Sequence, residues 1–567
     1  MDRRFFLALA LTIGVILLTP KLFPGAPVPV APITVDSETT APGSARTATT
    51  PEGRTSVPAT GRSAIGASAA PVEAPAAVPV RTLQLANALA TFEFSTRGAA
   101  LMRVDLPRYR RLRDDTGSAA LSDGARPLVK YRLIAGGDTI ALDAADFDVS
   151  QDVVDGKPRL AFATAIGAGR VRITYTLADS NYLADVAIEA TGLPAPAFLL
   201  TDLPRSFDTQ ESDSTEDRRH LAYAMRTPAG GAERIDFAKP DPGERLVRTG
   251  PFTWTVAKTK YFLVGLLAAD STASPFAEVQ VTGAMRVNKV AVRAEATAIS
   301  PIGASGIEFQ LYAGPQEWER LVALGREFEH ANPYGGWLSG AVQPFATIVM
   351  RILLWMKHTT ALQYGWILVI FGVAIRLLMW PLNTRMMRSQ MVMQRVSPLV
   401  QAAQAKYKSD PEKQREAVMK VYSDAGISPF APLAGCLPML LPMPVLLALF
   451  FVFQNTIEFR GVPFMWFPDI SVPDPLYIAP FLTGGSMFLL SWLGMRNVPP
   501  NPQTKMMAYM MPIMMTVFGI NFASGLNLYW FVQNFAAMPQ QWLISNERAK
   551  QSTAPAPAAD AGERKRR

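Results

Sequence analysis

One positively charged residue, Arg376, lies inside a long apolar segment. Its neighbours run Ile-Phe-Gly-Val-Ala-Ile before it and Leu-Leu-Met-Trp-Pro after it. Insertion scales put the free-energy cost of an arginine at the centre of a spanning helix at about 2.5–3.5 kcal/mol. We therefore predict that Arg376 faces protein or water, where its charge can attract an acidic group. The alternative is a side chain that reaches the lipid headgroups, because Pro381 lies only about 7.5 Å of helical rise away.

A second apolar segment, 524–543, carries a stripe of polar and aromatic side chains. Asn527, Trp530, Gln533 and Asn534 recur at helical spacing, with Tyr529 beside them. Together with Arg376 these residues could line a hydrated groove. The alternative is hydrogen bonding between helices, which is the commoner use of polar side chains in spanning segments.

The elements that must position these residues are apolar helices. The composition is 49% hydrophobic and 18% charged, whereas soluble proteins average about 25% charged residues. A bilayer is crossed by about 20 apolar helical residues. Five segments approach that length, which predicts a polytopic α-helical membrane protein with a five-helix core at 359–545: 361–382, 433–454, 476–494, 506–521 and 524–543.

The distribution of Lys and Arg predicts the orientation of these spans. Basic residues concentrate in the connection 383–432, around 495–505 and in the tail 546–567, whereas 455–475 has a single arginine. By the positive-inside rule the basic segments are cytoplasmic. The large region before the core is then periplasmic, both termini are cytoplasmic, and the protein lies in the bacterial inner membrane.

The N-terminal 80 residues predict an anchor and a tether. In segment 1–23, Arg3 and Arg4 precede an apolar stretch, which we interpret as a retained transmembrane anchor; a cleaved signal peptide is the alternative. Residues 24–80 are rich in Pro, Ala, Thr, Ser and Gly, and such a linker buries too little apolar surface to fold.

Residues 81–331 show the pattern of a large all-β sandwich. Short runs such as 91–95, 171–176 and 182–188 alternate apolar and polar residues between Gly, Pro, Asp and Asn. We expect a periplasmic scaffold or docking domain. A sugar-binding domain on a passive membrane anchor is the alternative, although no pair of carboxylates or histidines favours it.

Two further helical elements complete the prediction. Segment 332–358 has one apolar face at helical spacing, which is typical of an interfacial amphipathic helix; a core helix of the β domain is the alternative. The connection 383–432 predicts a helical hairpin in which Met386 and Met393 recur at seven and a second arm starts near Pro411. A solvated loop is the alternative there.

Several kinds of chemistry are excluded by residues the sequence lacks. The single cysteine, Cys436, cannot form an intramolecular disulfide, and three dispersed histidines without an HExxH motif make a metal site improbable. No phosphate-binding GxxxxGK[ST] loop is present. We therefore expect no enzyme activity, cofactor or metal, and the position of the basic residues beside apolar spans argues against specific DNA binding.

Residues 333–546 resemble the shared core of the YidC/Oxa/Alb family of membrane insertases. The resemblance rests on the order and spacing of several short motifs, because no single motif is specific enough to establish it. These are Arg376-Leu-Leu-Met-Trp-Pro-Leu382, Ser428-Pro429, Gly435-Cys-Leu-Pro438, Pro442-Met-Pro444, Met510-Met-Pro512, Phe522-Ala-Ser-Gly-Leu-Asn-Leu-Tyr-Trp530 and Gln540-Gln541.

The resemblance implies a chaperone-like insertase that moves nascent membrane proteins into the lipid bilayer, alone or with the Sec translocon. Arg376 would be the groove arginine, open to the cytoplasm and the bilayer. The hairpin and the basic tail would contact the ribosome, and the β domain would match the largely dispensable periplasmic domain of Gram-negative members. The spans near 433–454 and 506–521 would form an apolar exit slide, and the residues so assigned are Leu440, Leu441, Leu447, Met510, Met511 and Ile513, with Arg395, Lys406 and Lys408 in the hairpin.

Two positions depart from the family pattern. Gly372 stands where many relatives carry a hydroxyl residue, and Trp530 replaces a second tyrosine. Both concern the detailed polarity of the groove. A solute transporter is the rival function from another class, but it predicts paired internal repeats, and we find none.

Overall fold

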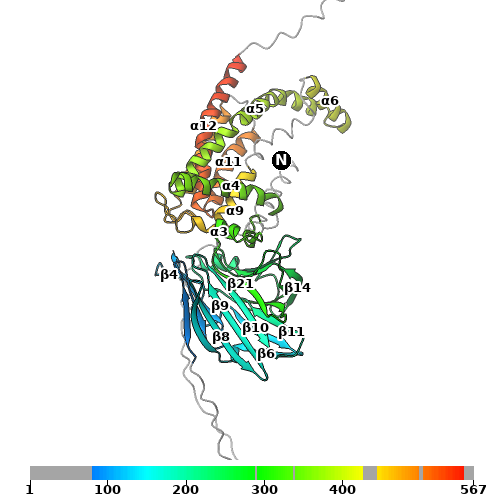
Figure 1. The fold of residues 1–567 in the computed structure, drawn as a ribbon. Coiled ribbons are helices and arrows are strands. Elements are labelled where there is room, and N and C mark those ends of the chain that lie inside the picture. The colour runs from blue at the N-terminus through cyan, green and yellow to red at the C-terminus, as the bar shows by residue number, and fades with distance from the viewer. Residues whose placement is uncertain (1–79, 288–289, 336–338, 425–442, 497–501, 554–567) are drawn as a thin grey trace, which may run out of the picture.

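The computed structural model describes residues 80–287, 290–335, 339–424, 443–496 and 502–553. They form a β region and a helical region that lie end to end (Figure 1). The predicted N-terminal anchor, nearly all of the linker and most of the basic tail lie outside the described residues. The predicted combination of a β-sandwich domain with a helical core is confirmed.

All strand pairs of the β region are antiparallel. A four-stranded sheet comprises β1 (Thr82–Ala86), β2 (Thr91–Ser95), β3 (Leu101–Arg110) and β4 (Ser118–Ala120). A nine-stranded sheet has the order β13 (Ala232–Asp236), β12 (Ala222–Arg226), β15 (Trp254–Lys258), β16 (Phe262–Ala268), β21 (Ile307–Pro315), β10 (Leu183–Thr191), β9 (Gly169–Leu177), β8 (Lys157–Ile166) and β7 (Asp148–Val154). A six-stranded sheet has the order β14 (Arg245–Phe252), β17 (Phe276–Gly283), β20 (Ala294–Pro301), β11 (Ala197–Asp202), β5 (Lys130–Ala135) and β6 (Asp138–Ala141), and β18 (Arg286–Val287) pairs with β19 (Val290–Ala291).

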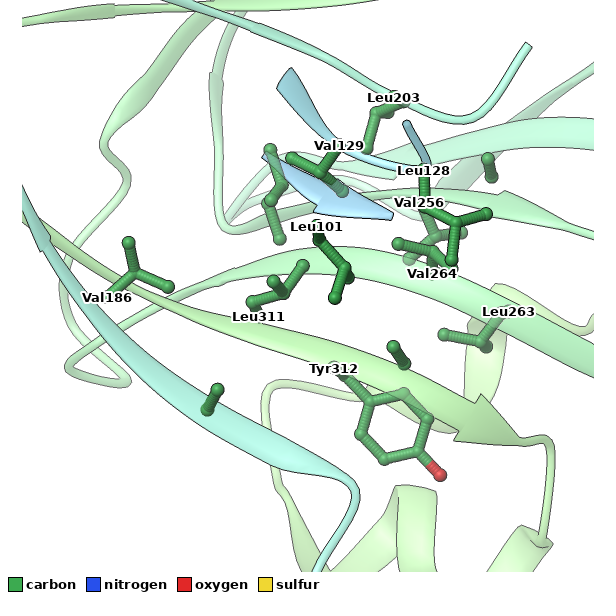
Figure 2. Packing of buried hydrophobic residues seen from close by; sticks show 14 of the residues in the cluster. Leu101, Leu128, Val129, Val186, Leu203, Val256, Leu263, Val264, Leu311 and Tyr312 are labelled. Carbon is green, nitrogen blue, oxygen red and sulfur yellow. The ribbon is translucent and has the colours of Figure 1, made fainter. Parts of the chain in front are cut away.

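The alternation in the sequence explains how these sheets pack. Along β9, Val171, Ile173 and Tyr175 are buried while Arg170 and Arg172 are exposed, because successive side chains of a strand point to opposite faces. The inward-facing side chains of several sheets meet in one apolar core, part of which is shown in Figure 2. Short helical segments border this region: η1 (Leu142–Ala144), α2 (Ser214–Arg219), α3 (Trp318–Ala323) and η2 (Phe328–Ala331).

The helical region has a helix at the described part of each predicted span, with different boundaries, and the spans themselves stay a prediction. Its elements are α4 (Ser339–Thr360), α5 (Tyr364–Lys406), α6 (Pro411–Asp424), α9 (Met443–Asn455), η4 (Ile457–Phe459), α10 (Ile478–Met495), α11 (Pro502–Gly519) and α12 (Ser524–Thr553). The first predicted span and the first arm of the hairpin form one continuous helix, α5, about 65 Å long at 1.5 Å per residue. The hairpin's second arm, α6, begins at Pro411.

Within the described ranges, three helices are long and apolar enough to cross a membrane: α4, the first part of α5 (Tyr364–Arg388) and α10. The helix α4 also has two distinct faces. Val349, Met350 and Leu353 are buried against the helical core, whereas Ile348 and Trp355 are 55% and 65% exposed. The interfacial position of α4 stays a prediction.

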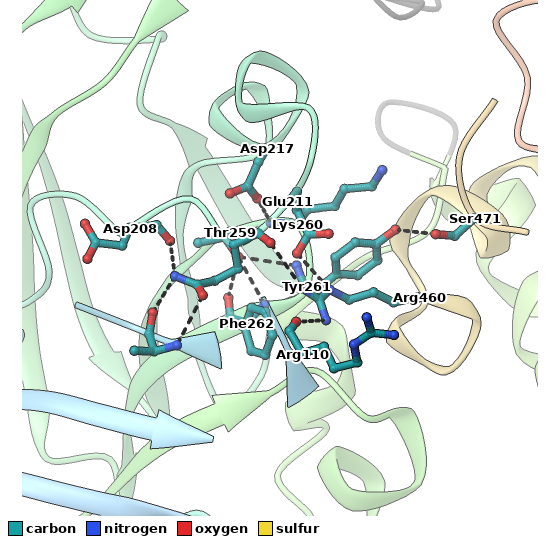
Figure 3. A network of polar contacts seen from close by, with 12 residues as sticks. Arg110, Asp208, Glu211, Asp217, Thr259, Lys260, Tyr261, Phe262, Arg460 and Ser471 are labelled. Atoms are coloured by element: carbon teal, nitrogen blue, oxygen red, sulfur yellow. Dashed lines mark hydrogen bonds and ion pairs between the residues drawn. The ribbon is translucent and has the colours of Figure 1, made fainter. Parts of the chain in front are cut away.

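The two regions meet in a buried polar interface (Figure 3). Arg460, which follows η4, donates from Nε to Glu211 Oε1 at 2.8 Å, and the two side chains are 3% and 10% exposed. Its guanidinium also lies 5.4 Å from the ring centroid of Phe262. Nearby, Tyr261 Oη donates to Ser471 Oγ at 3.3 Å. The connection between α9 and α10 is thus fixed to the β region.

The same connection contacts the start of α12. The backbone N–H of Ser524 donates to the carbonyl of Val472 at 2.8 Å, and that of Gly525 donates to the carbonyl of Ile470 at 2.9 Å. These bonds satisfy donors that a helix N-terminus otherwise leaves free. They link the β region, through one loop, to the helix that carries the polar stripe.

Candidate functional site between α5 and α12

Arg376 of α5 faces α12. Its Nη2 donates to Oε1 of Gln540 at 2.9 Å. The side chain is half-buried, and its Nε is buried without a hydrogen-bond partner among the described residues. No carboxylate of the described residues lies within ion-pair distance of it. The charge therefore turns toward the protein and is held by a neutral amide.

Gln540 is fixed in an orientation that presents its oxygen to Arg376. Its Nε2 donates to the carbonyl of Trp380 at 2.9 Å and to Oγ1 of Thr384 at 2.7 Å. The side chain is 1% exposed. Gln540 belongs to one of the family motifs in the sequence but was not among the predicted site residues. The available signal was its spacing, since Gln533 and Gln540 lie two helical turns apart and so share a face.

Gln533 and Tyr529 extend this face of α12 along α5. Gln533 Nε2 donates to the carbonyl of Gly372 at 2.8 Å and to Tyr529 Oη at 3.1 Å. A Cβ atom at position 372 would lie 3.2 Å from Val532 Cγ1 and 3.5 Å from the Tyr529 ring. The glycine thus permits close approach of the two helices and exposes its carbonyl to Gln533. The structure therefore places Tyr529 and Gln533 on the face of α12 that meets α5, the helix that carries Arg376. That these residues line a groove stays a prediction.

The other residues of the predicted stripe have different neighbours. Asn527 is fully buried, and its Nδ2 donates to the carbonyl of Gly519 at 2.8 Å. Asn534 Nδ2 donates to Ser486 Oγ of α10 at 3.1 Å. Trp530 stacks on Phe522, with ring centroids 6.0 Å apart. These contacts join α12 to α10, to α11 and to the turn between α11 and α12. They correspond to the alternative of polar side chains that hydrogen-bond between helices.

The predicted apolar slide has one exposed component in the described residues. On α11, Met510 and Ile513 are 57% and 60% exposed and continue a stripe with Met506 and Val517 at helical spacing. Met511 and Leu447 are half-buried. Leu440 and Leu441 lie outside the described residues. The slide itself stays a prediction.

The predicted hairpin residues lie on α5 or just after it. Met386 is half-buried, and Lys406 and Lys408 are exposed. The side chains of Met393 and Arg395 lie outside the part of the chain that can be described. The base of the hairpin is joined to α12 by an ion pair in which Arg388 Nη2 lies 2.8 Å from Glu547 Oε1.

Fold and site together define a class of protein. It is a polytopic helical membrane protein with a β-sandwich domain docked on one end and an arginine held by neutral groups between two of its helices. Among the described residues, no cluster of three or more His, Cys, Asp or Glu could hold a metal ion.

Comparison with known proteins assigns the chain to a family. The sequence model described as "YidC periplasmic domain" matches residues 82–348, and the one described as "60Kd inner membrane protein" matches residues 355–552. The membrane protein insertase YidC of Anaeromyxobacter dehalogenans is 32% identical over 70% of this chain and 71% of its own length. That of Chlorobaculum parvum is 29% identical over 81% of each chain. The chain belongs to the YidC family of membrane protein insertases.

Two kinds of protein are found among the solved structures that can be aligned with this chain. One is an active YidC insertase, which is 18% identical and covers 82% of this chain and 94% of its own, with a TM-score of 0.35. Another is a galactose mutarotase-like protein from Lactobacillus casei, which is 12% identical and covers 41% of this chain and all of its own, with a TM-score of 0.30.

Proposed function

We propose that this chain inserts hydrophobic segments of nascent membrane proteins into the bacterial inner membrane through a polar groove between α5 and α12. The observation that carries the proposal is the half-buried Arg376, whose described partner is the neutral amide of Gln540. Membership of the insertase family and the exposed apolar stripe on α11 support it.

The orientation follows from the charges. With 383–424 and the end of α12 in the cytoplasm, the β region lies in the periplasm and the loop after α9 closes the periplasmic end of the bundle. The basic hairpin and tail would then meet the ribosome, and work beside the Sec translocon is compatible with this arrangement. Nothing in this mechanism calls for a nucleotide or a cofactor.

The mechanism lowers the barrier to translocating a polar tail. Moving an apolar segment of about 20 residues into lipid is favourable, whereas drawing its polar flank through hydrocarbon is not. A hydrated groove that reaches partway through the membrane shortens the dry distance. The guanidinium of Arg376 has five N–H donors, and a carboxylate of the incoming tail can accept from those that Gln540 does not use. The apolar segment then leaves sideways along α11.

Substitution of Arg376 tests the charge role. We expect Arg376→Ala to reduce insertion of a substrate with an acidic translocated tail roughly tenfold or more, which corresponds to losing one charged hydrogen bond, and Arg376→Glu to reduce it further. The measurement is protease protection of the tail in proteoliposomes. The matched control is Arg385→Ala, an exposed arginine of the same helix without an ion-pair partner among the described residues, and a neutral-tail substrate of equal length is a second control. Full insertion of the acidic tail by both Arg376 variants would refute the role.

Crosslinking tests the path. A photoreactive residue at position 533 should label the polar tail of a stalled nascent chain, and one at position 513 should label its apolar segment. Labelling of neither position by a chain whose insertion requires this protein would exclude the proposed groove.

A further inference from the structure

A cavity of about 740 Å³ lies where the β region, the end of α4 and the start of α5 meet. Its walls come from β3 and the residues after it, from the N-terminal turn of α3, from the last turn of α4 and from the loop containing η4. Residues far apart in the sequence therefore surround one space, and many of them are charged. The lining includes Arg108, Arg110, Glu317, Glu319, Lys357, His358, Tyr364, Glu458 and Arg460.

Most of these charges are already paired within the protein. His358 lies 3.1 Å from Glu319, Arg320 lies 2.7 Å from Glu317, Arg460 lies 2.8 Å from Glu211, and Arg110 pairs with Asp115. Three lining charges remain without an ion-pair partner among the described residues: Glu458, Arg108 and Lys357. The unpaired set is one carboxylate and two cations.

Glu458 has an unused buried oxygen. Its Oε1 accepts the backbone N–H of Trp318 at 3.0 Å. Its Oε2 is buried and has no hydrogen-bond partner among the described residues. Burial, with the nearby carboxylates of Glu317 and Glu319, raises the pKa of Glu458 to about 7. A buried carboxylate oxygen without a donor is unfavourable, so the cavity wall lacks a cationic donor at this point.

The two cations are available on other parts of the wall. Lys357 Nζ donates to the carbonyl of Leu362 at 2.9 Å and lies 5.3 Å from the centroid of the Tyr364 ring, but neither contact neutralises it. Arg108 is exposed, with no ion-pair partner in the described part of the chain. A ligand that satisfies the whole cavity must therefore carry both an anion and a hydrogen-bonding cation.

The cavity borders the point where the chain enters the bilayer. The candidate span of α5 begins at Tyr364, which lines the cavity. Around this point Trp355, Leu362 and Trp366 are 65%, 37% and 46% exposed. Exposed tryptophans beside a spanning helix are typical of the headgroup level of a membrane. A ligand with an apolar tail could thus leave its tail in lipid while its polar end enters the cavity.

We propose that this cavity binds the headgroup of a zwitterionic phospholipid with a primary ammonium group, with the ammonium at Glu458 and the phosphate at Arg108 and Lys357. An ethanolamine headgroup has the required charges and N–H donors. A choline headgroup has the charge but cannot donate to Oε2 of Glu458. A glycerol headgroup satisfies the two cations and leaves Glu458 without a cation. The inference concerns a site separate from the groove and does not depend on the proposed mechanism of insertion.

Lipid-dependent thermal stability of the full chain tests the proposal. The purified protein is titrated in detergent with phosphatidylethanolamine, phosphatidylcholine or phosphatidylglycerol of identical acyl chains, and the apparent affinity is read from the shift in Tm. We expect phosphatidylethanolamine to bind about tenfold more tightly than phosphatidylcholine, as for one charged hydrogen bond. Glu458→Gln should remove that preference, and Lys357→Gln or Arg108→Gln should weaken binding of all three lipids.

The matched control is Glu308→Gln, which neutralises an exposed carboxylate at the start of β21, about 30 Å of extended chain from Glu317. It should keep the preference for ethanolamine. The assignment is overturned if Glu458→Gln also keeps it. The assignment to a lipid is overturned if soluble phosphoethanolamine, added alone at the same concentrations, gives the same shift as the phospholipid.

Discussion

At the scale of single residues, the charge of Arg376 is accompanied by neutral hydrogen-bonding groups rather than by a fixed counterion. The Gln540 amide accepts from it, and Trp380 and Thr384 hold that amide in place. A permanent carboxylate partner would neutralise the site and compete with any acidic substrate. A neutral amide positions the guanidinium and leaves its charge free to act on an incoming group.

We therefore expect Gln540→Glu to impair insertion strongly. The new carboxylate would lie within hydrogen-bond distance of Arg376 and form an ion pair with it, so insertion of acidic-tail substrates should fall nearly as far as in Arg376→Ala. The carboxylate cannot donate to the Trp380 carbonyl or to Thr384 Oγ1 as the amide does, so we also expect some loss of stability. A thermal unfolding curve checks that the variant is folded at the temperature of the insertion assay. The control is Gln541→Glu, because Gln541 faces Gly494 of α10 instead. Normal insertion by Gln540→Glu would contradict the role given to the free charge.

The site residues also show what a sequence pattern can specify. Arg376 was predictable because a charge within an apolar span requires a compensating environment. Asn527 and Asn534 share the spacing of Gln533, yet they contact other elements. Helical periodicity defines a face of α12, but α12 packs on α5 and on α10, and which residue meets which neighbour depends on tertiary packing.

Among the helices and strands, α5 stands out because one continuous helix carries both Arg376 and the first arm of the hairpin. The sequence predicted a span followed by a separate hairpin arm, with Pro381 just before the expected boundary. The helix continues through Pro381 to Lys406. A shift of the hairpin is therefore transmitted directly to the turn that carries Arg376. The end of α12 is joined to the same stretch through Arg388 and Glu547.

The Arg388–Glu547 pair should contribute little to stability. Its side chains are 57% and 38% exposed, and exposed ion pairs contribute about 0–1 kcal/mol. We expect Glu547→Gln to leave the unfolding midpoint nearly unchanged and to increase hydrogen exchange in residues 383–406. Glu412→Gln, a carboxylate on the other arm, is the control for lost charge. A decrease of several kcal/mol in the free energy of unfolding would show that the pair is more than a surface contact.

At the scale of the whole molecule, buried charges join the β region to the membrane core. Arg460 is enclosed by Glu211, Tyr261 and Phe262, and the loop that carries it also holds the start of α12. Sequence patterning identified the two regions but not this interface, because residues such as Glu211 and Arg460 are separated by 249 positions. Removing one partner of a buried pair typically costs about 3–5 kcal/mol.

Buried carboxyl groups at this interface determine how its stability depends on pH. Burial raises the pKa of Asp217 from 3.8 to about 7 and that of Glu458 from 4.5 to about 7. The folded protein therefore retains these protons where the unfolded chain has lost them, and the free energy of unfolding falls as pH rises from about 4 to 7. His220 opposes this trend, because burial lowers its pKa from 6.5 to about 4 and its stabilising contribution is lost as pH falls through that range.

The Asp217→Asn variant isolates the carboxyl contribution. Asparagine keeps an oxygen that accepts the backbone N–H of Lys260, which donates to Asp217 Oδ1 at 3.3 Å, but it cannot ionise. We expect the variant to be more stable than the wild type at pH 8, by up to about 4 kcal/mol for a pKa raised by about three units, and to differ little from it at pH 4. Thermal unfolding of the full chain, followed by tryptophan fluorescence from pH 4 to pH 8, measures this. His220→Gln should have the opposite effect and steepen the fall of stability with rising pH, because it removes a group whose stabilising contribution grows as pH rises. Equal pH profiles for the wild type and Asp217→Asn would mean that this carboxyl group is solvated, and that the interface between the two regions opens in solution.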